Sequence, residues 1–391
     1  MQRFLRFTAT ASQRGRSLFF LFLLSLFSLA QAQHTPFESA IALFEAKLAT
    51  DVANDSLGAI TAGVFVENKV VWKKGFGWAD PQNQVPAGGE TIYRIGSISK
   101  SMTAVLMIQM TKKGHFSLDD PIERFLPEIK LLQLPAGSKS VTFRLLATHT
   151  AGFAQEPDLP DAAEGPIETW EQKIIASIPT ITFIAKPGDK YSYSNIGYGV
   201  LGLAVSRAAQ RPFMDLMHEF MFSPLGMSST AFILTTDMKE RLSVGYANEQ
   251  ASPIGPGKPA YEHAGRGYKV PNGGVYSTVD DLAKFAMSQM GILPLPSIGP
   301  EELVEIRTRH VRSNQNASYG FGFSISDAEP GMVIVGHGGS VAGYTANLVF
   351  EPSEKIGVVL LRNYNRGSTN LGQAAHTLLR ELVTIRRQEQ R

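Results

Sequence analysis

The sequence predicts an α+β fold in which an antiparallel sheet, built from both ends of the chain and flanked by helices, carries an inserted, mostly helical domain. Two observations lead to this prediction. Strand patterns occur before residue 80 and return after residue 318, whereas helical periodicity and Gly- and Pro-rich connections dominate the residues between them. Strands grouped at both ends, with helices in the middle, are typical of one shared sheet rather than of alternating β-α units.

The first 32 residues have the pattern of a cleavable secretory signal peptide. Four arginines precede an apolar run over residues 18–29, and Ala30-Gln31-Ala32 offers a small-x-small site, so cleavage is expected after Ala32. The run is short for a membrane span, and an uncleaved N-terminal anchor is the alternative. We therefore expect a periplasmic or secreted protein with no stable membrane span. Because the chain contains no cysteine, it must be stable without disulfides.

Composition narrows the possible functions. The chain has 391 residues, of which 43% are hydrophobic and 18% charged, as in ordinary globular proteins. Without the first 32 residues, 33 basic side chains face 35 acidic ones, and no basic run suggests nucleic acid as a partner. The eight histidines are scattered and form no His-Glu-x-x-His motif, so no metal or other cofactor is expected.

The remaining 359 residues, 33–391, can form about two nominal domains. We predict that residues 33–115 and 275–391 form the α/β part, and that residues 116–274 form the helical insertion. In the first part, an apolar stripe predicts a helix over residues 36–50. The strands expected there cover residues 59–66, 69–72 and 76–78.

The middle of the chain is expected to combine helices with long loops. The expected helices begin at residue 121, cover residues 141–153 and 196–209, and begin again at Ser277 or Thr278. His149 is a tempting general base, but packing or loop fixing is favoured because no carboxylate lies near it in sequence. The acidic residues 155–171 could rim a site and favour cationic substrates, although a solvated loop is the favoured interpretation. Residues 253–274 are expected to form a long loop near the ligand.

The last ninety residues return to strand patterns separated by tight turns. The expected strands cover residues 319–325, 332–335, 345–350 and 355–361. A helix over residues 370–385 is expected to close the fold.

A Ser-x-x-Lys motif, formed by Ser97 and Lys100 at the start of an expected helix, is the first candidate site. At positions i and i+3 the two side chains share one helix face, roughly 5–6 Å apart. They also lie at the positive end of the helix, where developing negative charge is favoured. A nearby amine can act as the base that a serine hydroxyl needs to become a nucleophile. The motif is short, and Ser97 could instead be a simple N-cap.

Two further segments could meet this motif in space. Tyr193 and Asn195 flank a turn before an expected helix, although the phenol could simply pack and the amide could simply cap that helix. The other segment ends an expected strand in a glycine-rich turn and consists of His337, Gly338, Gly339 and Ser340.

In this order and spacing, the three segments resemble the serine β-lactamase and penicillin-binding-protein superfamily. The resemblance is strongest to the branch with class C β-lactamases, D-alanyl-D-alanine carboxypeptidases, D-aminopeptidases and β-lactamase-like esterases. The residues that match the Ser-x-x-Lys, Tyr-x-Asn and Lys/His-x-Gly motifs are Ser97 with Lys100, Tyr193 with Asn195, and His337 with Gly339. The resemblance covers roughly residues 37–385 and implies a β-lactamase/transpeptidase-like fold.

The resemblance implies a serine hydrolase that acts through an acyl-enzyme. Ser97 would be the nucleophile, and Lys100 and Tyr193 would share its proton. A Lys⁺ should lower the pKa of the phenol while burial lowers that of the amine, and neither is chosen as the base because the titrations of such a pair belong to both groups. The backbone N–H groups of Ser97 and Ser340 would form the oxyanion hole. The implied substrate-binding residues are Asn195, His337, Gly338 and Gly339.

His337 departs from the class C β-lactamases, which have lysine at this position. Because histidine is mostly neutral above about pH 6.5, it favours a peptidase or an esterase over an efficient β-lactamase. The expected substrates are a D-amino-acid peptide, including cell-wall peptide, a small ester or a β-lactam. One alternative is a penicillin- or peptide-binding sensor that acylates without turnover. Another is an α/β-hydrolase, but its Gly-x-Ser-x-Gly motif fails here at Ala342.

Overall fold

The computed structural model describes residues 36–246 and 266–391. Contacts divide the chain into two units, residues 1–39 and 40–391, and the description below concerns the larger one. The expected signal peptide and its cleavage site lie outside the described residues, as does most of the loop expected over residues 253–274. None of the described helices is both long enough and apolar enough to cross a membrane.

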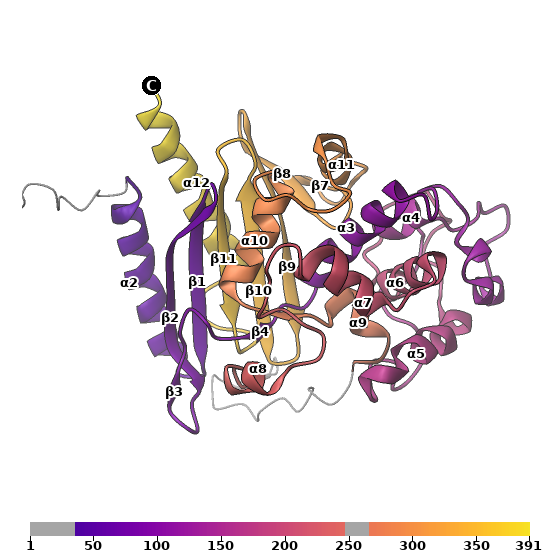
Figure 1. Ribbon diagram of the computed structural model, residues 1–391, viewed down its shortest axis with the longest axis horizontal. Coiled ribbons are helices and arrows are strands. Elements are labelled where there is room, and N and C mark those ends of the chain that lie inside the picture. Colours follow the sequence, from indigo (N-terminus) through magenta and orange to yellow (C-terminus); the bar gives the residue numbers. More distant parts are fainter. Residues whose placement is uncertain (1–35, 247–265) are drawn as a thin grey trace, which may run out of the picture. The chain divides into compact units, whose positions relative to one another are not determined.

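Nine of the described strands form one antiparallel sheet in the order β3-β2-β1-β11-β10-β9-β8-β7-β6 (Figure 1). Their bounds are β1 (Ala59–Val66), β2 (Lys69–Asp80), β3 (Val85–Pro86), β6 (Val311–Arg312), β7 (Ala317–Tyr319), β8 (Ser324–Glu329), β9 (Met332–Val341), β10 (Tyr344–Glu351) and β11 (Ile356–Arg362). The two ends of the chain meet where β1 pairs with β11. A small ribbon joins β4 (Tyr93–Arg94) to β5 (Tyr276–Ser277). The predicted α+β fold, with one sheet built from both chain ends, is confirmed.

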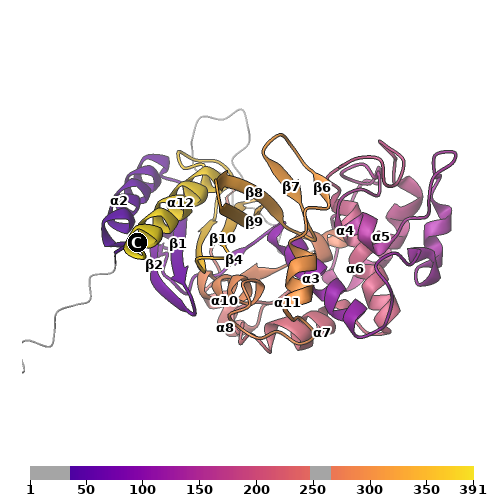
Figure 2. The same cartoon turned by 90° about the horizontal axis from the view of Figure 1, so that it is seen from above.

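Helices cover both faces of the sheet, and two of its inner strands are therefore buried throughout. Every residue of β1 and β11 is buried, as their nearly continuous apolar sequences require. Figure 2 shows α2 (Glu38–Asp55) and α12 (Leu371–Glu389) on one side and α10 (Val279–Gln289) on the other.

Further helices and long connections make up the rest of the described chain. These helices are α3 (Ile98–Lys112), α4 (Phe143–Ala147), α5 (Trp170–Ser177), α6 (Asn195–Ala209), α7 (Phe213–Met217), α8 (Thr236–Glu240), α9 (Val270–Gly273) and α11 (Pro300–Ile306). The helix α3 lies at the centre of the core, since every residue from Ile98 to Met110 is buried. It contacts α6, α9 and β9, and so joins the helical region to the sheet. Whether residues 116–274 form a separate domain stays a prediction.

Three expected strands differ from the observed ones. The strand expected over residues 76–78 is the end of β2, which runs unbroken from Lys69. The strand expected over residues 319–325 is wrong: it is two strands, β7 and β8, because Gly322 turns the chain with φ +75°. The strand β9 continues to Val341, and the His337 segment therefore lies within a strand rather than after one.

The helix expected over residues 141–153 is also shorter than predicted. It ends at Ala147, because His149 adopts a left-handed φ of +58° that a helix cannot contain. Of the two predicted caps for α10, Thr278 is the correct one: its side chain accepts a hydrogen bond from Asp281 N. The strand over residues 59–66 and the helix that ends at Ala209 are confirmed.

Candidate active site

The Ser-x-x-Lys motif lies at the N-terminus of α3, as predicted. Ser97 is the N-cap residue and is half-buried, while Lys100 lies in the first turn and is fully buried. The Lys100 Nζ atom lies 3.0 Å from Ser97 Oγ. The Ser97 hydroxyl is therefore partly accessible to a ligand, whereas the neighbouring Lys100 amine is shielded from water.

The Lys100 amine has two further partners, Asn195 Oδ1 at 2.7 Å and the backbone oxygen of Asn272 at 3.0 Å. Burial lowers the pKa of Lys100 well below its usual value, an effect that Lys269 increases and Glu156 opposes. A neutral amine has two N–H donors and one lone pair. The two carbonyl oxygens can accept the donors, which leaves the lone pair for the Ser97 O–H. This is the arrangement that a general base requires.

Asn272 was missed by sequence reasoning because it acts through its backbone. It lies in α9, which approaches α6 closely: a Cβ on Gly202 would lie 2.4 Å from Pro271 Cβ. The Asn272 side chain also donates to Asn195 O at 3.0 Å. Gly202 in α6 thus lets α9 approach closely enough for the backbone oxygen of Asn272 to accept a hydrogen bond from Lys100.

Tyr193 and Asn195 reach the site through the capping of α6. The hydroxyl of Ser194 accepts from Gly197 N at 3.0 Å and starts the helix, so Asn195 is its first residue. The Tyr193 ring centroid lies 4.9 Å from Lys100 Nζ. Burial raises the pKa of Tyr193, and a hydrogen bond with Ser97 opposes that effect. The expectation that the phenol's pKa is lowered is therefore wrong.

The opposite wall of the site is β9. A Cβ on Gly339 would lie 2.0 Å from the backbone oxygen of Ile95 and 3.1 Å from Ser97 N. A Cβ on Gly96, whose φ is +50°, would lie 2.8 Å from Ser340 N. Glycine at both positions lets β9 run directly against the start of α3. The backbone N–H groups of Ser97 and Ser340 are thereby brought together, as two oxyanion donors must be.

His337 lies buried on β9 with both ring nitrogens engaged. Its Nδ1 lies 2.5 Å from Gly338 O and therefore carries a proton, whereas Nε2 lies 3.1 Å from the Tyr319 hydroxyl and accepts. Burial, helped by Lys100, lowers the pKa of His337 to about 4. The imidazole is neutral at physiological pH and adds no cation to the site.

His149 fixes the loop that carries Tyr193. Its Nδ1 accepts from Ser194 N at 3.0 Å, and its backbone oxygen accepts from Ser192 N at 2.7 Å. Its ring lies 4.4 Å from the Tyr193 ring. Burial lowers the pKa of His149 well below its usual value. These contacts agree with the loop-fixing role favoured from the sequence.

Asn365 is a second residue that the sequence did not indicate. Its Oδ1 accepts from Gly343 N at 2.9 Å, and its Nδ2 donates to Val341 O at 2.6 Å and to Tyr344 O at 3.1 Å. These bonds hold the turn between β9 and β10, directly after Ser340. Asn365 therefore fixes the turn that follows Ser340, the residue expected to provide a second oxyanion donor.

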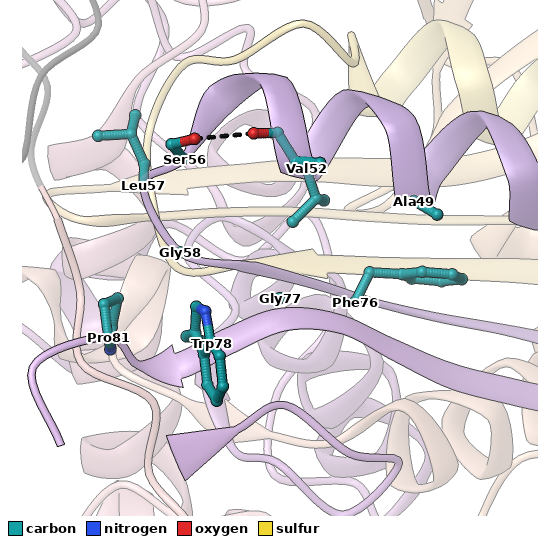
Figure 3. Close-up of a pocket in the computed structure, with 10 residues that line it drawn as sticks. Ala49, Val52, Ser56, Leu57, Gly58, Phe76, Gly77, Trp78 and Pro81 are labelled. Carbon is teal, nitrogen blue, oxygen red and sulfur yellow. Dashed lines mark hydrogen bonds between the residues drawn. The ribbon is translucent and has the colours of Figure 1, made fainter. Parts of the chain in front are cut away.

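Two hollows differ in their relation to this site. One of about 600 Å³ adjoins β9 and includes Gly338, Gly339 and Ser340 among its lining residues. The other, of about 420 Å³, lies between α2 and β2, and none of its lining residues belongs to the site (Figure 3). Its lining is apolar except for Ser56 and contains no ionisable side chain.

The described residues include no cluster of acidic, histidine or cysteine side chains that could hold a metal ion.

The fold and the three motifs define the β-lactamase and penicillin-binding-protein class. A sequence model of the Beta-lactamase family matches residues 44–381, and the chain therefore belongs to that family. Proteins of this superfamily are generally hydrolases.

Known proteins support this assignment. Beta-lactamase-like protein 4 of Dictyostelium discoideum is 27% identical over 328 residues, which is 78% of this chain and 56% of that protein. Protein flp of Staphylococcus aureus strain N315 is 23% identical over 302 residues, 76% of this chain and 58% of that protein. The chain thus spans a little over half the length of these relatives. The octameric penicillin-binding protein homologue from Pyrococcus abyssi superposes with a TM-score of 0.74 at 26% identity, covering 88% of this chain and 77% of that chain.

Proposed function

We propose that the protein is an exported serine hydrolase that cleaves an amide or an ester through an acyl-enzyme on Ser97. Family membership supports a hydrolase. One observation carries the acyl-enzyme mechanism: the buried Lys100 amine lies 3.0 Å from Ser97 Oγ, and its other two contacts are carbonyl oxygens. The amine is thus placed to accept a proton from that hydroxyl alone.

In the acylation step, Lys100 takes the proton of Ser97 while Oγ attacks the substrate carbonyl carbon. The carbonyl oxygen becomes an oxyanion and accepts from the N–H groups of Ser97 and Ser340. When the tetrahedral intermediate collapses, the bond to the leaving alcohol or amine breaks and the proton passes to that group. Tyr193, protonated and next to Ser97, can carry this proton outward.

In the deacylation step, a water attacks the acyl carbon, and its proton returns to Ser97 through the Lys100–Tyr193 pair. Acid is released and Ser97 is restored. We expect turnover because the pair that lies beside Ser97 Oγ in the free protein can serve deacylation as well as acylation. A sensor that acylates without turnover has no specific observation in its favour.

A panel of acyl donors tests the proposal. The purified protein is mixed with p-nitrophenyl esters, D-alanyl peptides and nitrocefin, while intact-mass measurement follows the protein and absorbance or chromatography follows the product. We expect product release together with a transient mass increase that is absent from Ser97→Ala. Stable labelling without product from any donor would contradict the hydrolase and support the sensor.

Export is a separate part of the proposal, and it rests on the pattern of residues 1–32. Expression of the full chain in a bacterial host, followed by fractionation and N-terminal sequencing, tests it. A mature protein that begins at Gln33 is the expected result. A full-length protein in the cytoplasm would contradict it.

A further inference from the structure

We propose that Glu156 recognises a cationic amine on the substrate, so that the preferred acyl donors carry an ammonium group close to the scissile carbonyl. This inference rests on the proposed function, since it concerns the same site. The observation that carries it is a hydrogen bond of 2.6 Å from Asn195 Nδ2 to Glu156 Oε1.

Glu156 is joined to the nucleophile by a short chain of contacts. Its partner Asn195 accepts from Lys100 Nζ at 2.7 Å, and Lys100 Nζ lies 3.0 Å from Ser97 Oγ. The Asn195 amide thus has Lys100 on its oxygen and a carboxylate on its nitrogen. A substrate chain that runs from Ser97 over Asn195 therefore approaches the negative charge of Glu156.

The backbone on either side of Glu156 is held in place. Gln155 O accepts from Asn195 N at 2.8 Å and from Ile196 N at 3.3 Å, at the beginning of α6. One residue earlier, Ala154 N donates to Thr182 O at 2.8 Å. A carboxylate beside this helix N-terminus is also favoured electrostatically. The position of Glu156 follows from these bonds, although its side chain is exposed.

Glu156 also differs from two of the other acidic residues of the same segment. Asp161 pairs with Lys173 at 2.9 Å, and Glu171 pairs with Arg207 at 4.0 Å. Across residues 36–246 and 266–391, no such ion pair is found for Glu156, whose contact is with the neutral amide of Asn195. Its charge is therefore available to a ligand, whereas those of Asp161 and Glu171 are already compensated.

Arg362 and Arg366 line the hollow beside Gly338, Gly339 and Ser340 on β9, but neither is among the charged groups that act on Lys100. The pKa of Lys100 is lowered by burial, and its amine points at Ser97 rather than at solvent. His337 is neutral and engaged on both sides. Lys269 acts on Lys100 electrostatically, and its amine lies 5.9 Å from the Tyr268 ring centroid. The charges beside Lys100 and Asn195 therefore fit a substrate ammonium group better than an anion.

The test compares three esters of one acid at pH 7: D-alanine methyl ester, its N-acetyl derivative and its N-succinyl derivative. On the same nitrogen they carry, respectively, no acyl group and a positive charge, a neutral acetyl group, and a succinyl group that ends in a carboxylate. The readout is the ratio of kcat/KM values within each variant, measured by product chromatography. Because Glu156 raises the pKa of Lys100, a ratio is needed to cancel any effect on the base.

We expect the wild-type protein to prefer the cationic ester to the neutral one about tenfold, the factor that 1.4 kcal/mol provides. Glu156→Gln should remove this preference, and Glu156→Lys should shift it toward the succinyl ester. Asp158→Asn, an exposed carboxylate in the same segment, is the matched control and should keep the wild-type ratio.

An unchanged ratio in both Glu156 variants, with all esters still hydrolysed, would overturn this inference and leave the proposed function intact. The same holds if Asp158→Asn changes the ratio as much as Glu156→Gln, since the effect would then be general electrostatics. If the wild-type protein hydrolyses none of the esters and Ser97 stays unlabelled by any acyl donor, the proposed function fails and this inference fails with it.

Discussion

The two walls of the site do different work with different parts of the chain. The helical wall supplies side chains: Ser97 and Lys100 from α3, and Tyr193 and Asn195 from the start of α6, joined by hydrogen bonds and ring contacts. The wall formed by β9 supplies backbone, and its histidine is neutral and already bonded to the protein. Removing a side chain from the helical wall should therefore abolish catalytic activity. On the β9 wall, activity should instead be lost when a side chain is added that displaces the backbone.

The largest effect is expected at the nucleophile. Ser97→Ala should lower kcat by about 10⁶-fold, because no other hydroxyl can take its place in the covalent step. Ser340→Ala is the contrasting variant, since the role given to Ser340 uses a backbone N–H that alanine retains. Steady-state kinetics on the best ester measures both. Substantial activity in Ser97→Ala would contradict the assignment of the helical wall.

A smaller loss is expected when the base is removed. Lys100→Met should lower kcat by about 10²–10⁴-fold, the usual contribution of general-base catalysis. Because only the neutral amine accepts a proton, the activity of the unmodified protein should fall as the pH drops below the pKa of Lys100. This acidic limb should be absent from the residual activity of Lys100→Met. If the acidic limb of the pH profile persists in Lys100→Met, the titrating group is a residue other than Lys100.

The sheet wall is tested by adding a side chain. Gly339→Val would force its Cβ against Ile95 O and Ser97 N, separating the two oxyanion donors and lowering kcat by about 10²–10³-fold. Thermal unfolding and circular dichroism check that the variant still folds. The matched control is Gly88→Ala, because a Cβ there meets nothing within 4 Å. Wild-type kcat in a folded Gly339→Val would contradict the role given to β9.

The same contrast explains what the sequence could and could not predict. Ser97 with Lys100, and Tyr193 with Asn195, are close in sequence and have characteristic spacings, so their motifs were recognisable. Asn272 and Asn365 were missed because both act through backbone hydrogen bonds with distant parts of the chain. The backbone oxygen of Asn272 accepts from Lys100, and the side chain of Asn365 donates to the backbone of Val341. Nothing in a single sequence marks such a contact.

Protonation states could not be read from the sequence either. A cationic lysine beside Tyr193 was expected to lower the pKa of the phenol, but burial, which depends on the whole fold, raises it. Similarly, Gly322 divides an apolar stretch that looked like one strand, because its left-handed conformation is invisible in the apolar pattern. Local spacing was informative, whereas burial and backbone conformation required the structure.

The smallest effect concerns stability rather than catalysis. The pKa of His337 falls from 6.5 to about 4 on folding, so between these pH values the unfolded chain binds the additional proton. The free energy of unfolding should therefore rise with pH across this window, by at most about 3 kcal/mol from this residue. His149 and the carboxylates add their own pH dependence. Urea unfolding at several pH values should consequently show a shallower rise for His337→Gln than for the wild-type protein, while His115→Gln, an exposed control, keeps the wild-type slope. Equal slopes for all three proteins would mean that the pKa of His337 is the same in the folded and the unfolded chain, which would contradict the lowered pKa of the imidazole on the β9 wall.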